Sequence, residues 1–173
     1  PRLARPTDSS SRVPQPEPGA PLAVVGSISE TTLEQLDYVP DSQLFHLDPS
    51  SLLGGTAGEA SVVADRLERA VPTVLTAASD LSTVDDTLTA GRDRGLSDTE
   101  IRDRVATRLA TVAANACRTT RPSGLFYTGG DVAVAGLRAL EATTVSLNGA
   151  TVDAGIPIGR LVDGDVADIP LIT

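Results

Sequence analysis

Four short, largely apolar segments, each leading into a polar or glycine-containing loop, constrain the fold of this chain more than any other feature. They cover residues 22–26, 42–47, 73–77 and 125–128. Short continuous apolar runs are typical of strands that are buried in a parallel sheet. Because helical patterns separate them, their order predicts repeated strand–helix–strand units. We expect an α/β fold with a mostly parallel, Rossmann-like sheet flanked by helices.

The helical patterns between these strands differ in strength. Leu33 and Leu36 give helical spacing up to the proline at position 40, and residues 58–71 carry one apolar and one charged face. The longest helix is predicted from Ser97, where the sequence SDTE forms a capping box, to about Arg118. A further helix is predicted after residue 130, up to about residue 141. Residues 79–86 are expected to form a polar loop.

Both ends of the chain differ from this central pattern. Residues 1–21 contain six prolines and few apolar side chains, so they cannot bury enough surface to offset the entropy of ordering and are predicted to be a flexible linker or tail. Residues 22–173 form the predicted domain. Its last part is expected to be β-rich, with short strands separated by glycine and proline turns at residues 144–147, 151–152, 158–162 and 169–172.

Composition excludes several kinds of function. The net charge of −9 disfavours binding to nucleic acid and to anionic membranes, and no apolar run is long enough to span a bilayer. All 14 cationic side chains are arginine, which excludes chemistry that depends on a lysine. Cys117 is expected to be a buried core residue, and His46, without a second ligand nearby, is assigned to a strand flank. We expect a cytoplasmic protein.

The chain begins with proline and contains no methionine. We therefore expect it to be a piece of a longer or processed polypeptide.

Residues 124–140, with the sequence GLFYTGGDVAVAGLRAL, hold the strongest candidate site. A helix that starts just after a glycine pair presents unpaired N–H groups and the positive end of its dipole, which favours anions. Asp131 could hold a metal ion or could be an ordinary acid of the first helical turn. Ser27 and Ser29, at the end of the first strand, could bind a ligand or cap the next helix.

Three motifs in this order resemble those of the four-carbon acid sugar kinase family. Residues 26–35 resemble the segment GSxSxxTxxQ that opens the nucleotide-binding domain of that family. Residues 128–131, TGGD, resemble its central TGGDT or GGDT motif, and residues 155–157 resemble the GxP turn in a β-rich tail. The likeness covers about residues 22–173.

The resemblance implies a kinase of two domains, in which an amino-terminal domain, absent from this chain, holds a small-molecule substrate. The implied substrate is a four-carbon sugar acid such as a 3-oxo-tetronate, threonate or erythronate. The present domain would hold ATP and Mg²⁺. A homodimer is an open alternative for the assembly. The implied nucleotide-binding residues are Ser27, Ser29, Gly129, Gly130, Asp131 and Val132, with Asp131 as the metal ligand.

Departures from the family pattern favour one alternative, and the glycine turn allows another. Val132 replaces the usual threonine after GGD, Gly149 and Ala150 stand where a glutamate is usual, and Glu30 replaces a proline. A nucleotide- or metabolite-binding module that has lost catalysis is therefore the first alternative. An oxidoreductase that binds a dinucleotide at the same turn ranks last, because the first strand is not followed by GxGxxG.

Overall fold

The computed structural model describes residues 18–48, 58–78, 80–153 and 155–173. They form a seven-stranded sheet in the order β2-β3-β1-β4-β7-β6-β5. The five strands from β2 to β7 in that order are parallel to their neighbours, and β6 and β5 continue the sheet in antiparallel fashion. The predicted α/β class, with a mostly parallel sheet and a β-rich carboxyl-terminal part, is confirmed.

Apart from one helix at residues 81–92 and one strand at residues 145–153, the strands and helices follow the predicted order along the chain. The strands are β1 (Leu22–Val25), β2 (Leu44–His46), β3 (Thr73–Thr76), β4 (Leu125–Thr128), β5 (Val145–Asp153), β6 (Ile156–Leu161) and β7 (Pro170–Ile172). The helices are α1 (Glu30–Leu36), α3 (Gly58–Glu68), α4 (Leu81–Arg92), α5 (Asp98–Thr119) and α6 (Gly130–Ala139).

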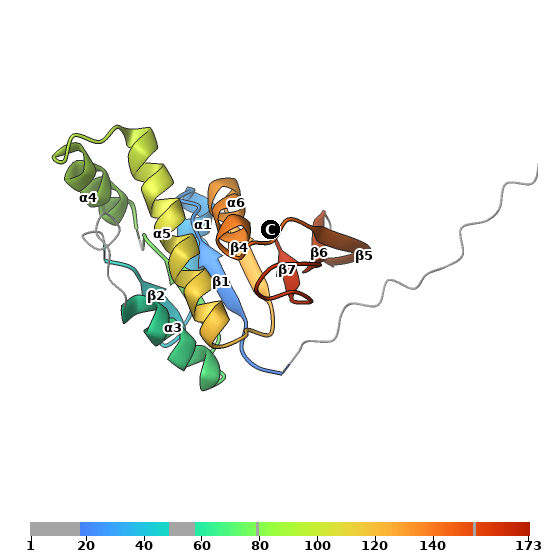
Figure 1. Cartoon of the computed structure of the whole chain (residues 1–173). Helices are drawn as coiled ribbons and strands as arrows, with labels where there is room; N and C mark the ends of the chain where they lie inside the picture. Colours follow the sequence, from blue (N-terminus) through green and yellow to red (C-terminus); the bar gives the residue numbers. More distant parts are fainter. Residues whose placement is uncertain (1–17, 49–57, 79, 154) are drawn as a thin grey trace, which may run out of the picture.

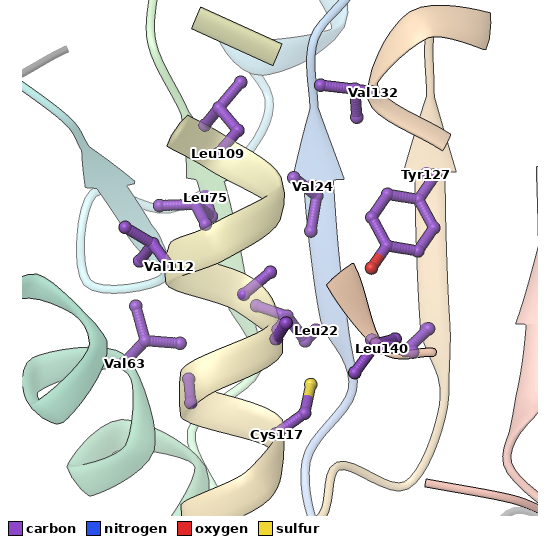
Figure 2. Packing of buried hydrophobic residues seen from close by; sticks show 14 of the residues in the cluster. Leu22, Val24, Val63, Leu75, Leu109, Val112, Cys117, Tyr127, Val132 and Leu140 are labelled. Atoms are coloured by element: carbon purple, nitrogen blue, oxygen red, sulfur yellow. The ribbon is translucent and has the colours of Figure 1, made fainter. Parts of the chain in front are cut away.

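Most of the hydrophobic core lies between one face of the sheet and the helices α3, α5 and α6. Figure 1 shows these helices over the sheet, with α5 crossing it near the middle. Leu22 and Val24 of β1 and Leu75 of β3 meet Leu109 and Val112 of α5 in this layer, as Figure 2 shows. A smaller cluster on the other face joins α1 to the sheet. The central parallel strands are therefore covered on both faces.

Two predictions for secondary structure were wrong. Residues 81–86, predicted as part of a polar loop, form the start of α4, and Asp80 caps this helix by accepting a 2.8 Å hydrogen bond from the N–H of Thr83. Residue 79 lies outside the described residues. Threonine and aspartate have weak helix propensity, so the α4 sequence looks polar and irregular, yet α4 packs on α5. The short strands predicted at 144–147 and 151–152 are one strand, β5, because its register shifts at a bulge near Gly149 instead of ending there.

The amino-terminal boundary can be compared with the predicted linker only in part. Residues 1–17 lie outside the described residues, and so do residues 49–57, where a short turn was expected. Ala20 is buried, and its carbonyl accepts a hydrogen bond from the N–H of Ser123. The carbonyl of Pro21 likewise accepts one from Thr73. Contacts of the domain therefore extend to Ala20.

Asp163 gives stability to the carboxyl-terminal part that depends on pH. Hydrogen bonds from the hydroxyl and the N–H of Thr143, and from the N–H of Thr144, lower the pKa of Asp163 to about 2. A carboxylate whose pKa is lower in the folded state stabilises above its unfolded pKa of ~3.9, and this contribution is lost as the pH falls through the folded pKa. Replacing Asp163 with asparagine should flatten the pH dependence of urea unfolding between about pH 4 and pH 2. An unchanged pH profile would contradict this assignment.

Candidate functional site

The turn between β4 and α6 forms an exposed helix start that no side chain caps. Gly129 occupies the N-cap position with a φ of +103°, and no side chain caps the helix. The N–H groups of the first helical turn, at Gly130, Asp131 and Val132, have no partner within a helix. A Cβ at position 129 would also lie 3.2 Å from the backbone nitrogen of Ser27. Glycine is therefore required at 129, and the turn leaves donors for an anion.

The loop after β1 lies directly against this turn. The N–H groups of Gly26 and Ser27 donate hydrogen bonds of 2.9 and 3.2 Å to the carbonyl oxygen of Thr128. The reason is the strand order, because β1 pairs in parallel with β4 and Val25 lies opposite Thr128. The first two motifs identified in the sequence are thus joined at one edge of the sheet.

The hydroxyl groups of Ser27, Ser29 and Thr32 form a small hydrogen-bonded cluster in that loop. The Thr32 hydroxyl donates to the Ser27 oxygen at 2.9 Å, and the Thr32 and Ser29 hydroxyl oxygens lie 2.8 Å apart. Ser29 is also the N-cap of α1 and accepts from the N–H of Thr32. The capping role expected for one of the two serines is therefore present at Ser29, and a ligand at this loop would exchange one of these bonds.

A cavity of about 490 Å³ opens at this edge of the sheet, and all six residues predicted to bind nucleotide line it. One end is formed by residues 25–29, which are the last residue of β1 and the loop after it, and by residues 129–132 after β4. The loop after β3 and one face each of α4 and α5 form the rest. Ligands of open α/β sheets bind outside the carboxyl ends of the strands, which is where this cavity lies.

The wall formed by α4 and α5 is mainly apolar. Val84 and Leu88 of α4 face Ile101 and Val105 of α5 around the cavity. Thr76 also lines it, but its hydroxyl is engaged in the turn after β3 with the carbonyl of residue 78, at 3.0 Å. The cavity thus combines a glycine-rich end carrying hydrogen-bond donors with an apolar wall, a combination that suits a ligand with an anionic and an apolar part.

Val132 lies beside the cavity but its side chain belongs to the core. It is 2% exposed, and a Cβ added to Gly26 would come within 2.6 Å of its Cγ2 atom. Figure 2 shows it above Tyr127 among the core residues. Val132 can therefore offer its backbone N–H to a ligand, but not its buried methyl groups.

Among the described residues that line the cavity, Asp131 is the only one with a carboxylate side chain. It is exposed and stands in the first turn of α6. Within the part of the chain that the structure describes, no group of three or more His, Cys, Asp or Glu residues is arranged to hold a metal ion. One carboxylate still suits Mg²⁺, which usually keeps several waters and takes further ligands from substrate phosphates.

The third motif is not part of this cavity, although it lies at the same edge of the sheet. Residue 155 precedes β6 and residues 156–157 begin it. β6 runs antiparallel to β7, while β7 is parallel to β4. The start of β6 therefore lies at the edge where β4 ends. Two strand spacings separate them, about 10 Å. Ala150, at the position where the family pattern has a glutamate, is buried.

Sequence reasoning missed the wall of the cavity that α4 and α5 provide, including Arg102. The signal for α4 was present: Asp80 is a good N-cap, and Leu81, Val84 and Leu88 recur at helical spacing. The position of Arg102 at the cavity could not be predicted from nearby residues, because α5 carries charged residues on most of its exposed surface.

The remaining two candidates have ordinary roles. Cys117 is buried, as predicted, and burial raises the pKa of its thiol to about 12, so it stays protonated. His46 is exposed at the end of β2. No helix among the described residues has the length and apolar character needed to cross a membrane.

The fold and this cavity define an α/β domain with a ligand-binding edge, and comparison with known families identifies it as a nucleotide-binding domain. Residues 22–173 match the family described as the nucleotide-binding C-terminal domain. The chain belongs to this family, the carboxyl-terminal nucleotide-binding domains of four-carbon acid sugar kinases. The resemblance found in the sequence motifs is therefore confirmed.

Curated relatives of this chain are kinases. The chain is 30% identical to a D-threonate kinase of Salmonella typhimurium over 172 residues, which cover 88% of this chain and 38% of that enzyme. It is 39% identical to a D-threonate kinase of Bordetella bronchiseptica over 71 residues, which cover 41% of this chain and 17% of the relative. The chain thus spans less than two fifths of the length of these relatives.

Solved structures share the fold. A domain of unknown function from Bordetella bronchiseptica, a domain-swapped dimer with bound citrate, matches with a TM-score of 0.65 and 27% identity, covering 90% of this chain and 37% of that one. A Haemophilus influenzae protein matches with a TM-score of 0.58 at 16% identity, covering 88% and 35%. The second likeness supports the fold alone.

Proposed function

We propose that this chain is the ATP-binding part of a cytoplasmic kinase that transfers the γ-phosphoryl group of ATP to the terminal hydroxyl of a four-carbon sugar acid. The 3-oxo-tetronates, threonate and erythronate are the acids in question. Membership of the family supports the nucleotide, and the D-threonate kinases among the relatives support the substrate class. The sugar acid would be held by a separate amino-terminal domain, so the chain alone would bind ATP without turning it over.

The observation that carries this proposal is the contact between the uncapped start of α6 and the serine loop after β1. Gly130 faces open space, because a Cβ built there meets no atom within 4 Å. The polyphosphate of ATP would occupy this space, accept hydrogen bonds from the first N–H groups of α6 and lie beside Ser27 and Ser29. The apolar wall from α4 and α5 then suits the base.

Asp131 would hold Mg²⁺, directly or through water, against the phosphate oxygens. When bound, Mg²⁺ neutralises part of the charge that develops on the transferred phosphoryl group. Phosphoryl transfer asks little covalent chemistry of the protein, so the task of this chain is to position the nucleotide. The fixed backbone of 129 and the serine loop would keep the γ-phosphate at the mouth of the cavity, open to the other domain.

The role of Asp131 is testable by titration calorimetry. The exchange of Asp131 for asparagine keeps the shape and removes the charge, so we expect binding of ATP with Mg²⁺ to weaken about tenfold. Binding of ATP without Mg²⁺ should stay the same or improve, since a repulsive carboxylate has been removed. The wild-type titration tests ATP binding itself. Equal weakening with and without the metal would remove Asp131 as a metal ligand.

A second candidate is a nucleotide- or metabolite-binding module without catalysis. The buried side chain of Val132 favours it, because a threonine hydroxyl of the family motif is missing there. A coupled assay for ADP release by the longest polypeptide that contains this chain, with D-threonate and its epimer as substrates, separates the two functions. Turnover would exclude the inactive module, and ATP binding without turnover of any four-carbon acid would support it.

A further inference from the structure

A triphosphate bound in the cavity would need positive charge nearby, and this chain has few cationic side chains. The whole sequence carries a net charge of −9 and no lysine. Among the described residues that line the cavity, Arg102 of α5 bears the positive charge and Asp131 the negative one. The helix start at Gly130 offers partial charge, but the triphosphate of ATP carries several full negative charges. Arg102 is therefore the protein cation placed to compensate them.

Among the described residues, Arg102 has no hydrogen-bonded partner, because another ion pair engages the nearby carboxylate of Asp98. It stands four residues after Asp98, the spacing at which an acid and a base usually pair on a helix. Both oxygens of Asp98 are instead engaged by Arg92, at the end of α4, through two hydrogen bonds of 2.8 Å from Nε and Nη2. Arg102 acts on Asp98 through its charge alone. Within the described part of the chain, its guanidinium thus retains its donors for a ligand.

The position of Arg102 on α5 places it at the outer end of the cavity. Arg102, Val105 and Leu109 all line the cavity on one face of α5. Arg102 is exposed and Leu109 is fully buried, and about 10 Å of helix axis separates them at a rise of 1.5 Å per residue. The buried end lies against the core and the exposed end against the opening, where the terminal phosphates of a bound nucleotide would emerge.

We infer that Arg102 binds the β- or γ-phosphate of ATP and so sets the preference of this site for ATP over nucleotides with fewer phosphates. The inference rests on the proposed function and adds a residue to it. A guanidinium presents its donors as a planar fork that matches two phosphate oxygens, and such charge-assisted bonds are among the strong ones in proteins. Arg92 has a part in this arrangement, since its bond to Asp98 leaves Arg102 free to bind phosphate.

Titration calorimetry with ATP, ADP and AMP tests this inference on the whole chain. The exchange of Arg102 for glutamine should weaken ATP binding about tenfold or more and AMP binding less than about twofold. Arg102→Lys should retain part of the affinity for ATP, because it keeps the charge and loses the fork. The matched control is Arg104→Gln, which removes an exposed arginine of the same helix, four residues after Glu100 and outside the cavity lining. It should bind like the wild type.

The outcomes separate this inference from the proposed function. Wild-type binding of ATP with equal affinities for Arg102→Gln and Arg104→Gln would overturn the role of Arg102 and leave the nucleotide site in place. An equal loss for ATP and AMP in Arg102→Gln would overturn the assignment to the terminal phosphates. A wild-type chain that binds no nucleotide would remove both. Circular dichroism should show all variants folded, since Arg102 and Arg104 are exposed.

Discussion

Replacing Gly130 with valine is expected to weaken ATP binding about a hundredfold while leaving the domain folded. A Cβ at this position meets no atom within 4 Å, and Gly130 lines the cavity at the start of α6. The branched side chain would fill the space in front of the free N–H groups and keep phosphate oxygens from reaching them. Two lost charge-assisted hydrogen bonds, at about 1.5 kcal/mol each or more, correspond to this factor. Calorimetry with ATP and Mg²⁺ measures it.

The same variant has a clear structural control. Its thermal unfolding should resemble that of the wild type, because a Cβ at this position meets no atom within 4 Å and the φ of residue 130 is not positive. Gly130→Ala should fall between the two in affinity, with a smaller group in the same place. If Gly130→Val binds ATP as tightly as the wild type, the start of α6 is not the phosphate site, whatever binds elsewhere in the chain.

Replacing Gly136 with alanine is expected to destabilise the domain strongly, although helix propensity alone favours alanine by about 1 kcal/mol. The new Cβ would lie 2.5 Å from Cε1 and Cζ of Tyr127, whose ring is 1% exposed under α6. The ring is enclosed by the core, as Figure 2 shows for its neighbours Leu140 and Val132, so it cannot move aside cheaply. Overpacking of this kind costs about 1–3 kcal/mol, sometimes more.

Urea unfolding of Gly136→Ala beside Gly130→Ala measures this effect within one helix. The two variants carry the same chemical change in α6, but a Cβ at 130 has open space and a Cβ at 136 has an aromatic ring. A loss at 136 would lower the melting temperature by about 2–4 °C for each kcal/mol in a domain of this size. A Gly136→Ala variant as stable as Gly130→Ala would show that α6 does not sit this closely on Tyr127.

Much of the fold could be predicted from local patterns. The four strands predicted from short apolar segments appear within a few residues of their predicted bounds. The bounds of β4, Leu125–Thr128, are the predicted ones. Ser97 and Glu100 form the predicted capping box at the start of α5. These features depend on residues close in the sequence. The helix α4 was missed because its threonines and aspartates outweighed the helical spacing of its few apolar residues. Its stability comes from packing, with Gly91 allowing Ile101 of α5 to approach closely.

The two halves of the candidate site illustrate the same division. The chemistry of each half is local: a glycine pair before a helix, and serines before another. The contact between the halves is not local, because Gly129 comes 102 positions after Ser27 in the sequence. They meet because β4 pairs with β1 on the side opposite β3, so that Thr128 accepts hydrogen bonds from residues 26 and 27. In the sequence, this contact was indicated by the family resemblance, which assigns both motifs to one nucleotide site.

The sequence by itself therefore determined the class of fold, the absence of lysine chemistry and the residues of the glycine turn. All of these depend on composition or on neighbours a few positions apart. Only the tertiary structure decided that Val132 is a core residue packed on Gly26, that α4 and α5 wall the cavity, and that Asp98 pairs with Arg92 and not with Arg102. These outcomes depend on which distant side chains compete for the same space or the same carboxylate, as Arg92 does for Asp98.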